Sequence, residues 1–147
     1  MESKTRIFFA QPVDSIERNL VVERVQKVRN LVRDLPVEII APYSDEIWFS
    51  LPLNREDAIS VIEKDILALD SCDILLVDLS CDDRLAIGIV FEMAYFWFIS
   101  KKKIIVYAGN SSVADRVWIT GTTQNICRSW EDLKKIVQKC IQTYELK

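Results

Sequence analysis

The chain has 147 residues, of which 50% are hydrophobic and 28% charged, with a formal net charge of -3. This composition favours one globular domain over residues 1–147, and its acidic balance argues against a nucleic-acid partner. No apolar run approaches the roughly 18 residues of a membrane span or forms a signal-peptide core, so we expect a cytoplasmic protein that does not bind membranes.

Strand and helix patterns alternate along the chain. Apolar residues recur at helical spacing after the first short β run, and Ser129 begins a Ser-Trp-Glu-Asp sequence with capping-box character. In chain order we predict a strand over 6–10, a helix over 13–34, a strand over 37–41, a loop over 43–54, a helix over 55–69, a buried strand over 73–79, a helix containing Glu92, a strand over 103–108, a loop over 109–115, short strands over 117–120 and 125–127, and a helix from Ser129.

This alternation predicts an α/β fold. Strands that alternate with helices form a parallel sheet covered on both faces, so we expect a five-stranded, mostly parallel sheet in a Rossmann- or flavodoxin-like three-layer sandwich. Ligands in such sheets bind at the carboxyl ends of the strands. The segments that would build that edge are residues 11–12, 42–50, 80–88 and 109–112.

Glu92 lies in one of the most apolar segments of the chain, where an unpaired charge is costly. It follows the loop after the third strand by about one helical turn, so its side chain can point back toward the ligand edge. The alternative is a structural role, either exposed or in a salt bridge, because perturbed carboxylates are often structural.

The residue types for other chemistries are missing. The chain has no histidine, and Cys72, Cys81, Cys127 and Cys140 form no CxxC pair. These absences argue against zinc sites, a disulfide framework and histidine-based nucleophile pairs, so we expect packing roles for the cysteines and neither a metal nor a cofactor. If the chain is an enzyme, carboxylates are the groups expected to carry its catalysis.

Several motifs carry a resemblance to a known family. They are the initial Ile-Phe-Phe-Ala-Gln-Pro, the interval of eight residues between Asp65 and Asp73-Ile-Leu-Leu-Val, and Gly88-x-x-x-Glu92-Met-Ala-Tyr followed by Lys103-Ile-Ile-Val-Tyr. In order and spacing, over most of the chain, they resemble the nucleoside 2'-deoxyribosyltransferase superfamily, which includes deoxynucleoside 5'-monophosphate N-glycosidases.

The resemblance implies an enzyme of nucleotide metabolism, a transferase or a hydrolase. Glu92 resembles the nucleophile that attacks C1' of the sugar and forms a glycosyl ester, which water or an acceptor base then resolves. Asp65 matches the carboxylate that handles the base or its proton, and Gly88 would let the backbone approach the sugar. The alternative is a catalytically inactive module that binds or senses nucleotides. On its own, Asp65 also fits a solvated helix face.

Two departures from the family pattern bear on activity. Ala86 stands where the family commonly carries Asp or Ser to hold a sugar hydroxyl or a 5'-phosphate, although Asp82 or Asp83 could substitute. Gln11 stands where the first-strand motif usually has glycine, which would narrow the approach of a phosphate. These departures keep the sensing alternative open.

Further substrate contacts are expected from the loops. Tyr43 and Trp48 could stack on a nucleobase or pack in the core. The resemblance also suggests an Asn or Ser after the fourth strand that reaches a neighbouring subunit's site, which leaves Asn110, Ser111 and Ser112 as candidates. The substrate-binding candidates are Gln11, Tyr43, Trp48, Asp83, Gly88, Asn110 and Ser112.

The Glu92 helix is apolar on every side from Phe91 to Ile99, apart from Glu92 itself. A helix of this kind is buried all round, so one side should cover the sheet and the other should meet a second subunit. We therefore expect a homodimer or a larger homo-oligomer, which agrees with the assemblies of the resembled family.

Overall fold

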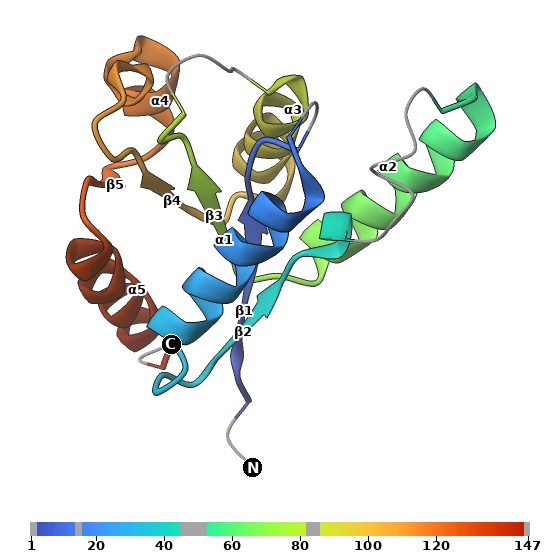
Figure 1. The fold of residues 1–147 in the computed structure, drawn as a ribbon. Coiled ribbons are helices and arrows are strands. Elements are labelled where there is room, and N and C mark those ends of the chain that lie inside the picture. The colour runs from blue at the N-terminus through green and yellow to red at the C-terminus, as the bar shows by residue number, and fades with distance from the viewer. Residues whose placement is uncertain (1–2, 14–15, 45–52, 82–85, 146–147) are drawn as a thin grey trace.

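The computed structural model describes residues 3–13, 16–44, 53–81 and 86–145. Its five strands form one sheet in the order β2-β1-β3-β4-β5, and every neighbouring pair runs parallel (Figure 1). This confirms the predicted α/β fold. The strands are β1 (Thr5–Ala10), β2 (Val37–Ile40), β3 (Ile74–Asp78), β4 (Lys103–Tyr107) and β5 (Asn125–Cys127).

The helices complete a three-layer arrangement, in which α1 and α5 lie on one side of the sheet and α2 and α3 on the other (Figure 1). In the described ranges, no helix is long and apolar enough to cross a membrane. The helical elements are α1 (Arg18–Leu31), η1 (Pro42–Ser44), α2 (Arg55–Asp70), α3 (Ile87–Tyr95), the π-helical turn η3 (Phe96–Ser100), η4 (Ser112–Asp115), α4 (Val117–Thr122) and α5 (Trp130–Glu145).

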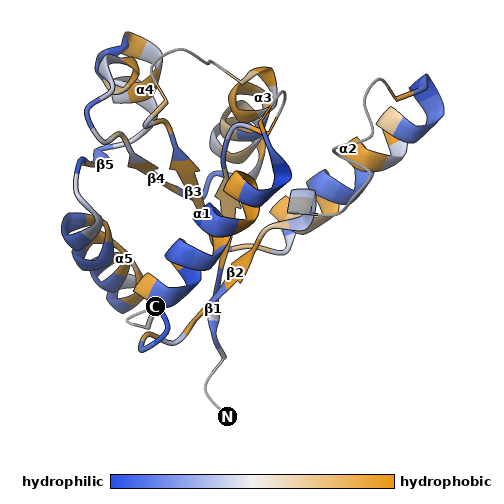
Figure 2. Ribbon diagram, viewed as in Figure 1, coloured by the Kyte–Doolittle hydropathy of each residue, from blue (hydrophilic) through white to orange (hydrophobic). Residues whose placement is uncertain are grey.

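The core is centred on β1 and β3. All five residues of β3 are buried, as are the last four of β1, because both strands have neighbours on each side and helices above and below. Apolar residues accordingly colour the centre of the sheet, while α5 turns a polar side outward (Figure 2). The largest fully buried side chains include Phe8, Phe9, Phe96, Leu75 and Leu133.

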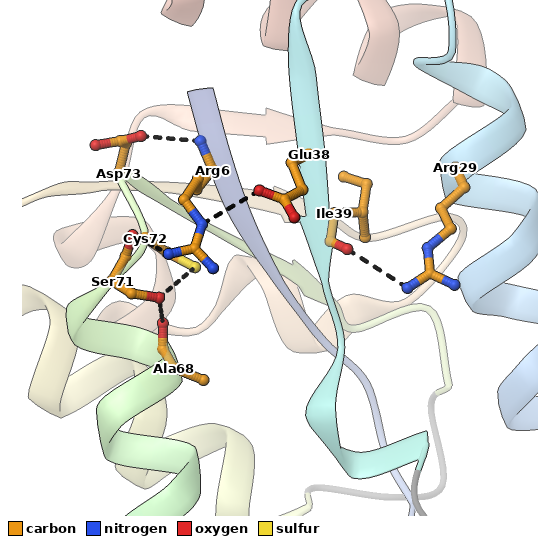
Figure 3. A network of polar contacts seen from close by, with 8 residues as sticks. All are labelled: Arg6, Arg29, Glu38, Ile39, Ala68, Ser71, Cys72 and Asp73. Carbon is orange, nitrogen blue, oxygen red and sulfur yellow. Dashed lines mark hydrogen bonds and ion pairs between the residues drawn. The ribbon is translucent and has the colours of Figure 1, made fainter. Parts of the chain in front are cut away.

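Polar contacts hold the amino end of the sheet, opposite the predicted ligand edge (Figure 3). The backbone N–H of Arg6 donates to Asp73 Oδ2 at 2.8 Å, and the Asp73 N–H donates back to the Arg6 carbonyl at 2.8 Å. The Arg6 side chain also pairs with Glu38 at 3.3 Å and donates to the Ser71 carbonyl at 3.4 Å. Arg6 therefore ties β1 to β2 and to the start of β3.

The structure corrects two element predictions. The segment predicted as a strand over 117–120 is helix α4, in which the N–H groups of Ile119 and Thr120 both donate to the Arg116 carbonyl. Its apolar residues produce a strand-like pattern, yet Val117 and Trp118 are exposed and are not core residues. The helix predicted from residue 13 begins only at Arg18.

The start of α5 follows the prediction. The Ser129 hydroxyl accepts a hydrogen bond from the Asp132 N–H at 3.1 Å, as a capping residue does. The cap satisfies one of the helix's free donors and fixes where α5 leaves β5.

Candidate active site

The candidate site lies where the chain leaves the carboxyl ends of the central strands. Gln11 directly follows β1, Tyr43 lies in η1 after β2, and Glu92 lies in the second turn of α3. The chain crosses from β2 over β1 to β3, so this is the switch point at which open α/β sheets bind ligands. The segments enclose a small pocket of about 30 Å³, room for about one or two water molecules. It is lined by Gln11, Val13, Tyr43, Ala86, Gly88, Ile89 and Glu92.

Two carboxyl groups from different helices meet at this site. Asp65, in the third turn of α2, shares a hydrogen bond with Glu92 of α3. Both residues are partly buried, and Asp65 Oδ1 is inaccessible to solvent. The two residues singled out as catalytic candidates therefore lie in contact.

Burial is the main reason that the pKa of each carboxyl group is raised. The pKa of Glu92 lies well above its usual range because burial disfavours the charged form, and the hydrogen bond and negative charge of Asp65 raise it further. Burial also raises the pKa of Asp65, while the hydrogen bond from Glu92 lowers it. Because both shifts favour a protonated carboxyl group, the pair is suited to hold one proton between its two members.

Gln11 and Tyr43 form the polar wall opposite. The Gln11 side chain is 2% exposed, and its Nε2 donates to the Val21 carbonyl at 3.0 Å and to the Tyr43 hydroxyl at 3.4 Å. Burial, together with the charges of Glu92, Asp78 and Asp65, raises the pKa of Tyr43 well above its ordinary value, so the phenol keeps its proton. The wall therefore holds a neutral hydroxyl near the carboxyl pair.

Asp78 supports the same edge at the end of β3. It is 3% exposed, and its Oδ1 accepts hydrogen bonds from the Ser80 N–H at 2.9 Å and the Ser80 hydroxyl at 2.6 Å. Its charge raises the pKa of Tyr43 and of Tyr107.

Gly88 and Ala86 line the pocket from the start of α3. A Cβ added at Gly88 would meet no atom within 4 Å, so this backbone faces open space. Ala86 gives its side of the pocket no polar group. Ala86, which departs from the pattern of the resembled family, therefore lies at the site itself.

The remaining candidates are not among the described residues that line this pocket. Trp48, Asp82 and Asp83 are outside the described residues. Asn110 and Ser112 lie after β4 and do not line the pocket. Their loop is held by Arg128, whose Nη1 donates to the carbonyls of Gly109 at 3.1 Å and Ser111 at 3.0 Å.

The described residues contain no cluster of potential ligands that could hold a metal ion. Cys72, Cys127 and Cys140 are buried and free, as expected for packing roles. Burial raises the pKa of Cys127 to about 12, so this thiol is not poised as a nucleophile.

The fold and the site together define a class: a doubly wound α/β protein with a hydrogen-bonded carboxyl pair at the switch point of its sheet. Neither a family model nor a curated protein matches the sequence. Solved structures do match the fold. A 2-deoxyribosyltransferase from Bacillus psychrosaccharolyticus aligns with a TM-score of 0.67 and 19% identity, over 88% of this chain and 90% of the other.

Two further structures align over nearly their whole length. A conserved protein from Enterococcus faecalis has a TM-score of 0.66 and 16% identity, over 92% of this chain and 99% of its own. The CMP N-glycosidase of Clostridium botulinum has a TM-score of 0.58 and 13% identity, over 91% and 98%. The chain thus has the fold of nucleoside 2'-deoxyribosyltransferase-like proteins, as its motifs predicted.

Proposed function

We propose that the chain cleaves the N-glycosidic bond of a nucleoside, a deoxynucleoside or its 5'-monophosphate, through a covalent intermediate on Glu92. The observation that carries this proposal is the hydrogen-bonded pair of Asp65 and Glu92 at the switch point of the sheet. Two structures with the same fold are a 2-deoxyribosyltransferase and a CMP N-glycosidase, which supports this reaction class.

In the first step, the proton of the pair moves to Asp65 and Glu92 becomes the nucleophile. The Glu92 carboxylate forms a bond to C1' of the sugar as the bond between C1' and the base nitrogen breaks. The electron pair of that bond leaves with the base, which takes the proton from Asp65.

In the second step, Asp65 acts as the base. It removes a proton from water as the oxygen attacks C1', and the glycosyl ester breaks to release Glu92. An acceptor base that attacks the same carbon through its nitrogen would give transfer in place of hydrolysis. Both carboxyl groups are thus required in both steps. Glu92 is first the nucleophile and then the leaving group, and Asp65 is first the acid and then the base.

The test is base release from a panel of nucleosides and 5'-nucleotides, followed by chromatography, with and without a competing base. Glu92→Gln and Asp65→Asn should each lower kcat by at least about 100-fold, in line with the contribution of a positioned acid or base. Glu63→Gln is the matched control, because Glu63 lies on the same helix as Asp65 but is exposed. It should leave kcat unchanged.

The competing base separates the two reactions, since a new nucleoside forms only by transfer. Base release that survives Glu92→Gln would refute the mechanism. Ligand-dependent thermal shifts without any base release would instead support a sensing module, the alternative that Ala86 and Gln11 keep open.

We also propose that the protein acts as a homodimer or larger homo-oligomer through the outer side of α3. The side chains of Phe91 and Phe98 are 73% and 59% exposed in the single chain. Between α3, η3 and α4 lies an apolar groove of about 410 Å³, whose lining includes Trp97, Phe98 and Trp118. Exposed apolar surface of this kind marks an interaction site. A second copy is the partner we favour because α3 carries Glu92 on one side and the apolar face on the other.

A further inference from the structure

Gln11 carries a buried acceptor with no partner. Its side-chain oxygen, Oε1, is inaccessible to solvent and receives no hydrogen bond in the structure, although the residue lines the Glu92 pocket. Leaving an amide oxygen buried without a donor is unfavourable, so such groups call for an explanation, often a ligand or an ordered water.

The orientation of this amide is determined by its neighbours. The Val21 carbonyl can only accept, so the atom that faces it at 3.0 Å must be the donor Nε2. The same Nε2 donates to the Tyr43 hydroxyl at 3.4 Å. With both amide hydrogens engaged, Gln11 offers the pocket an acceptor and no donor.

The other described polar groups of the pocket do not satisfy this acceptor. Glu92 is hydrogen-bonded to Asp65, and Ala86 has no polar side chain. The Tyr43 hydroxyl accepts from Gln11 Nε2 and makes no hydrogen bond to Oε1. Among the described residues no group supplies the missing donor, and a molecule that enters the site can supply it.

We infer that Gln11 Oε1 selects substrates by accepting a hydrogen bond from an N–H or O–H group of the bound nucleoside. This inference rests on the proposed function and makes Gln11 a specificity-determining residue. The donor is either an exocyclic amino group of the base or a hydroxyl of the sugar. Either group can donate a hydrogen bond to the amide oxygen. A substrate without the donor leaves the acceptor unpaired, so it should bind about tenfold to a hundredfold more weakly.

The experiment measures Kd by calorimetry for matched ligand pairs. One arm compares deoxycytidine with deoxyuridine and deoxyadenosine with deoxyinosine, which differ in the exocyclic amino group. The other arm compares each ribonucleoside with its 2'-deoxy form and each 2'-deoxy form with its 2',3'-dideoxy form. We expect discrimination of tenfold or more in favour of the donor-bearing member in one of these arms.

Gln11→Met removes the acceptor with little change in length and should reduce that ratio to within about twofold of unity. Gln26→Met is the matched control, because Gln26 lies exposed on α1 and bonds only to Asn30 among the described side chains. It should leave the ratio unchanged. If Gln11→Met does not fold, equal Kd values for both members of every pair in the unmodified protein would still overturn the inference.

The outcomes distinguish this inference from the proposed function. No discrimination in either arm, or a Gln11→Met variant that weakens all ligands by one factor, would overturn the role of Gln11 while base release could persist. Conversely, Gln11-dependent discrimination in binding without base release would preserve the role of Gln11 and refute the glycosidase.

Discussion

Glu92 is held in a setting that opposes its own ionisation. Burial and the neighbouring Asp65 raise its pKa, so the folded chain prefers the protonated form. A group of this kind destabilises the fold wherever the unfolded chain would ionise it. The raised pKa of Glu92 also favours a proton at the site.

Glu92→Gln should therefore stabilise the protein in a pH-dependent way. Below the ordinary glutamate pKa of 4.5, both folded and unfolded chains hold the proton, and the variant should match the unmodified protein. As pH rises above that value the unfolded chain ionises first, so the unmodified protein loses stability and the variant does not. At pH 8 the variant should have the higher Tm, by about 2–4 °C for each kcal/mol of relieved cost. Calorimetry at pH 4 and pH 8 measures this, and an equal Tm difference at both would contradict it.

Two glycines near the site should respond oppositely to alanine. Gly109 has a φ of +53°, and a Cβ there would lie 3.1 Å from the Cβ of Ser80, so Gly109→Ala should cost about 1 kcal/mol or more. Gly88→Ala meets open space within a helix and should keep or raise Tm. Because the same space adjoins Glu92, Gly88→Ala should still weaken substrate binding. Denaturant unfolding and ligand titration of both variants test the contrast.

At the level of elements, most of the fold was predictable because its periodicities are strong. The buried strand β3 and the capped helix α5 stand out in the sequence, since core strands are continuously apolar and capping residues act locally. Helix α4 was wrongly predicted as a strand because its apolar residues lie on an exposed surface. Apolar residues that do not face the core need not follow the helical spacing. The contact of Gln11 with Tyr43 could not be predicted, since it depends on how the chain turns after β2.

The two helix caps should contribute equally. Asn54 accepts from the Asp57 N–H at 2.8 Å at the start of α2, as Ser129 does for α5. Replacing either residue with alanine should cost about 0.5–2 kcal/mol in the free energy of unfolding. Because α2 carries Asp65, we expect Asn54→Ala also to raise KM, whereas Ser129→Ala should leave it unchanged. A KM that changes equally in both variants would show that the effect is general destabilisation.

The whole molecule has an uneven surface. Its largest exposed apolar side chains include Phe91, Phe98 and Ile99 around α3 and Val117 and Trp118 on α4. Figure 2 shows hydrophobic residues around α3, whereas α5 presents polar residues outward. An apolar surface around α3 and α4 beside a polar one on α5 supports the proposed association of copies through α3.

Sedimentation at micromolar concentration should therefore find a dimer or larger species. Combining Phe98→Ser with Trp118→Ser should produce a folded monomer, since central aromatic residues contribute about 2 kcal/mol or more each to an interface. Leu20→Ser is the control, as Leu20 is 46% exposed on α1, across the sheet. It should leave the assembly intact, and an unmodified protein that sediments as a monomer would refute the proposed interface.

The two outer strands of the sheet limit how copies can associate. β2 spans only Val37–Ile40 and β5 only Asn125–Cys127, so each open edge presents few unpaired backbone groups. Short edges offer a poor template for another chain's strand, and natural proteins use them to avoid aggregation. The proposed assembly on helix faces could thus be apolar and tight without inviting extension of the sheet at these edges.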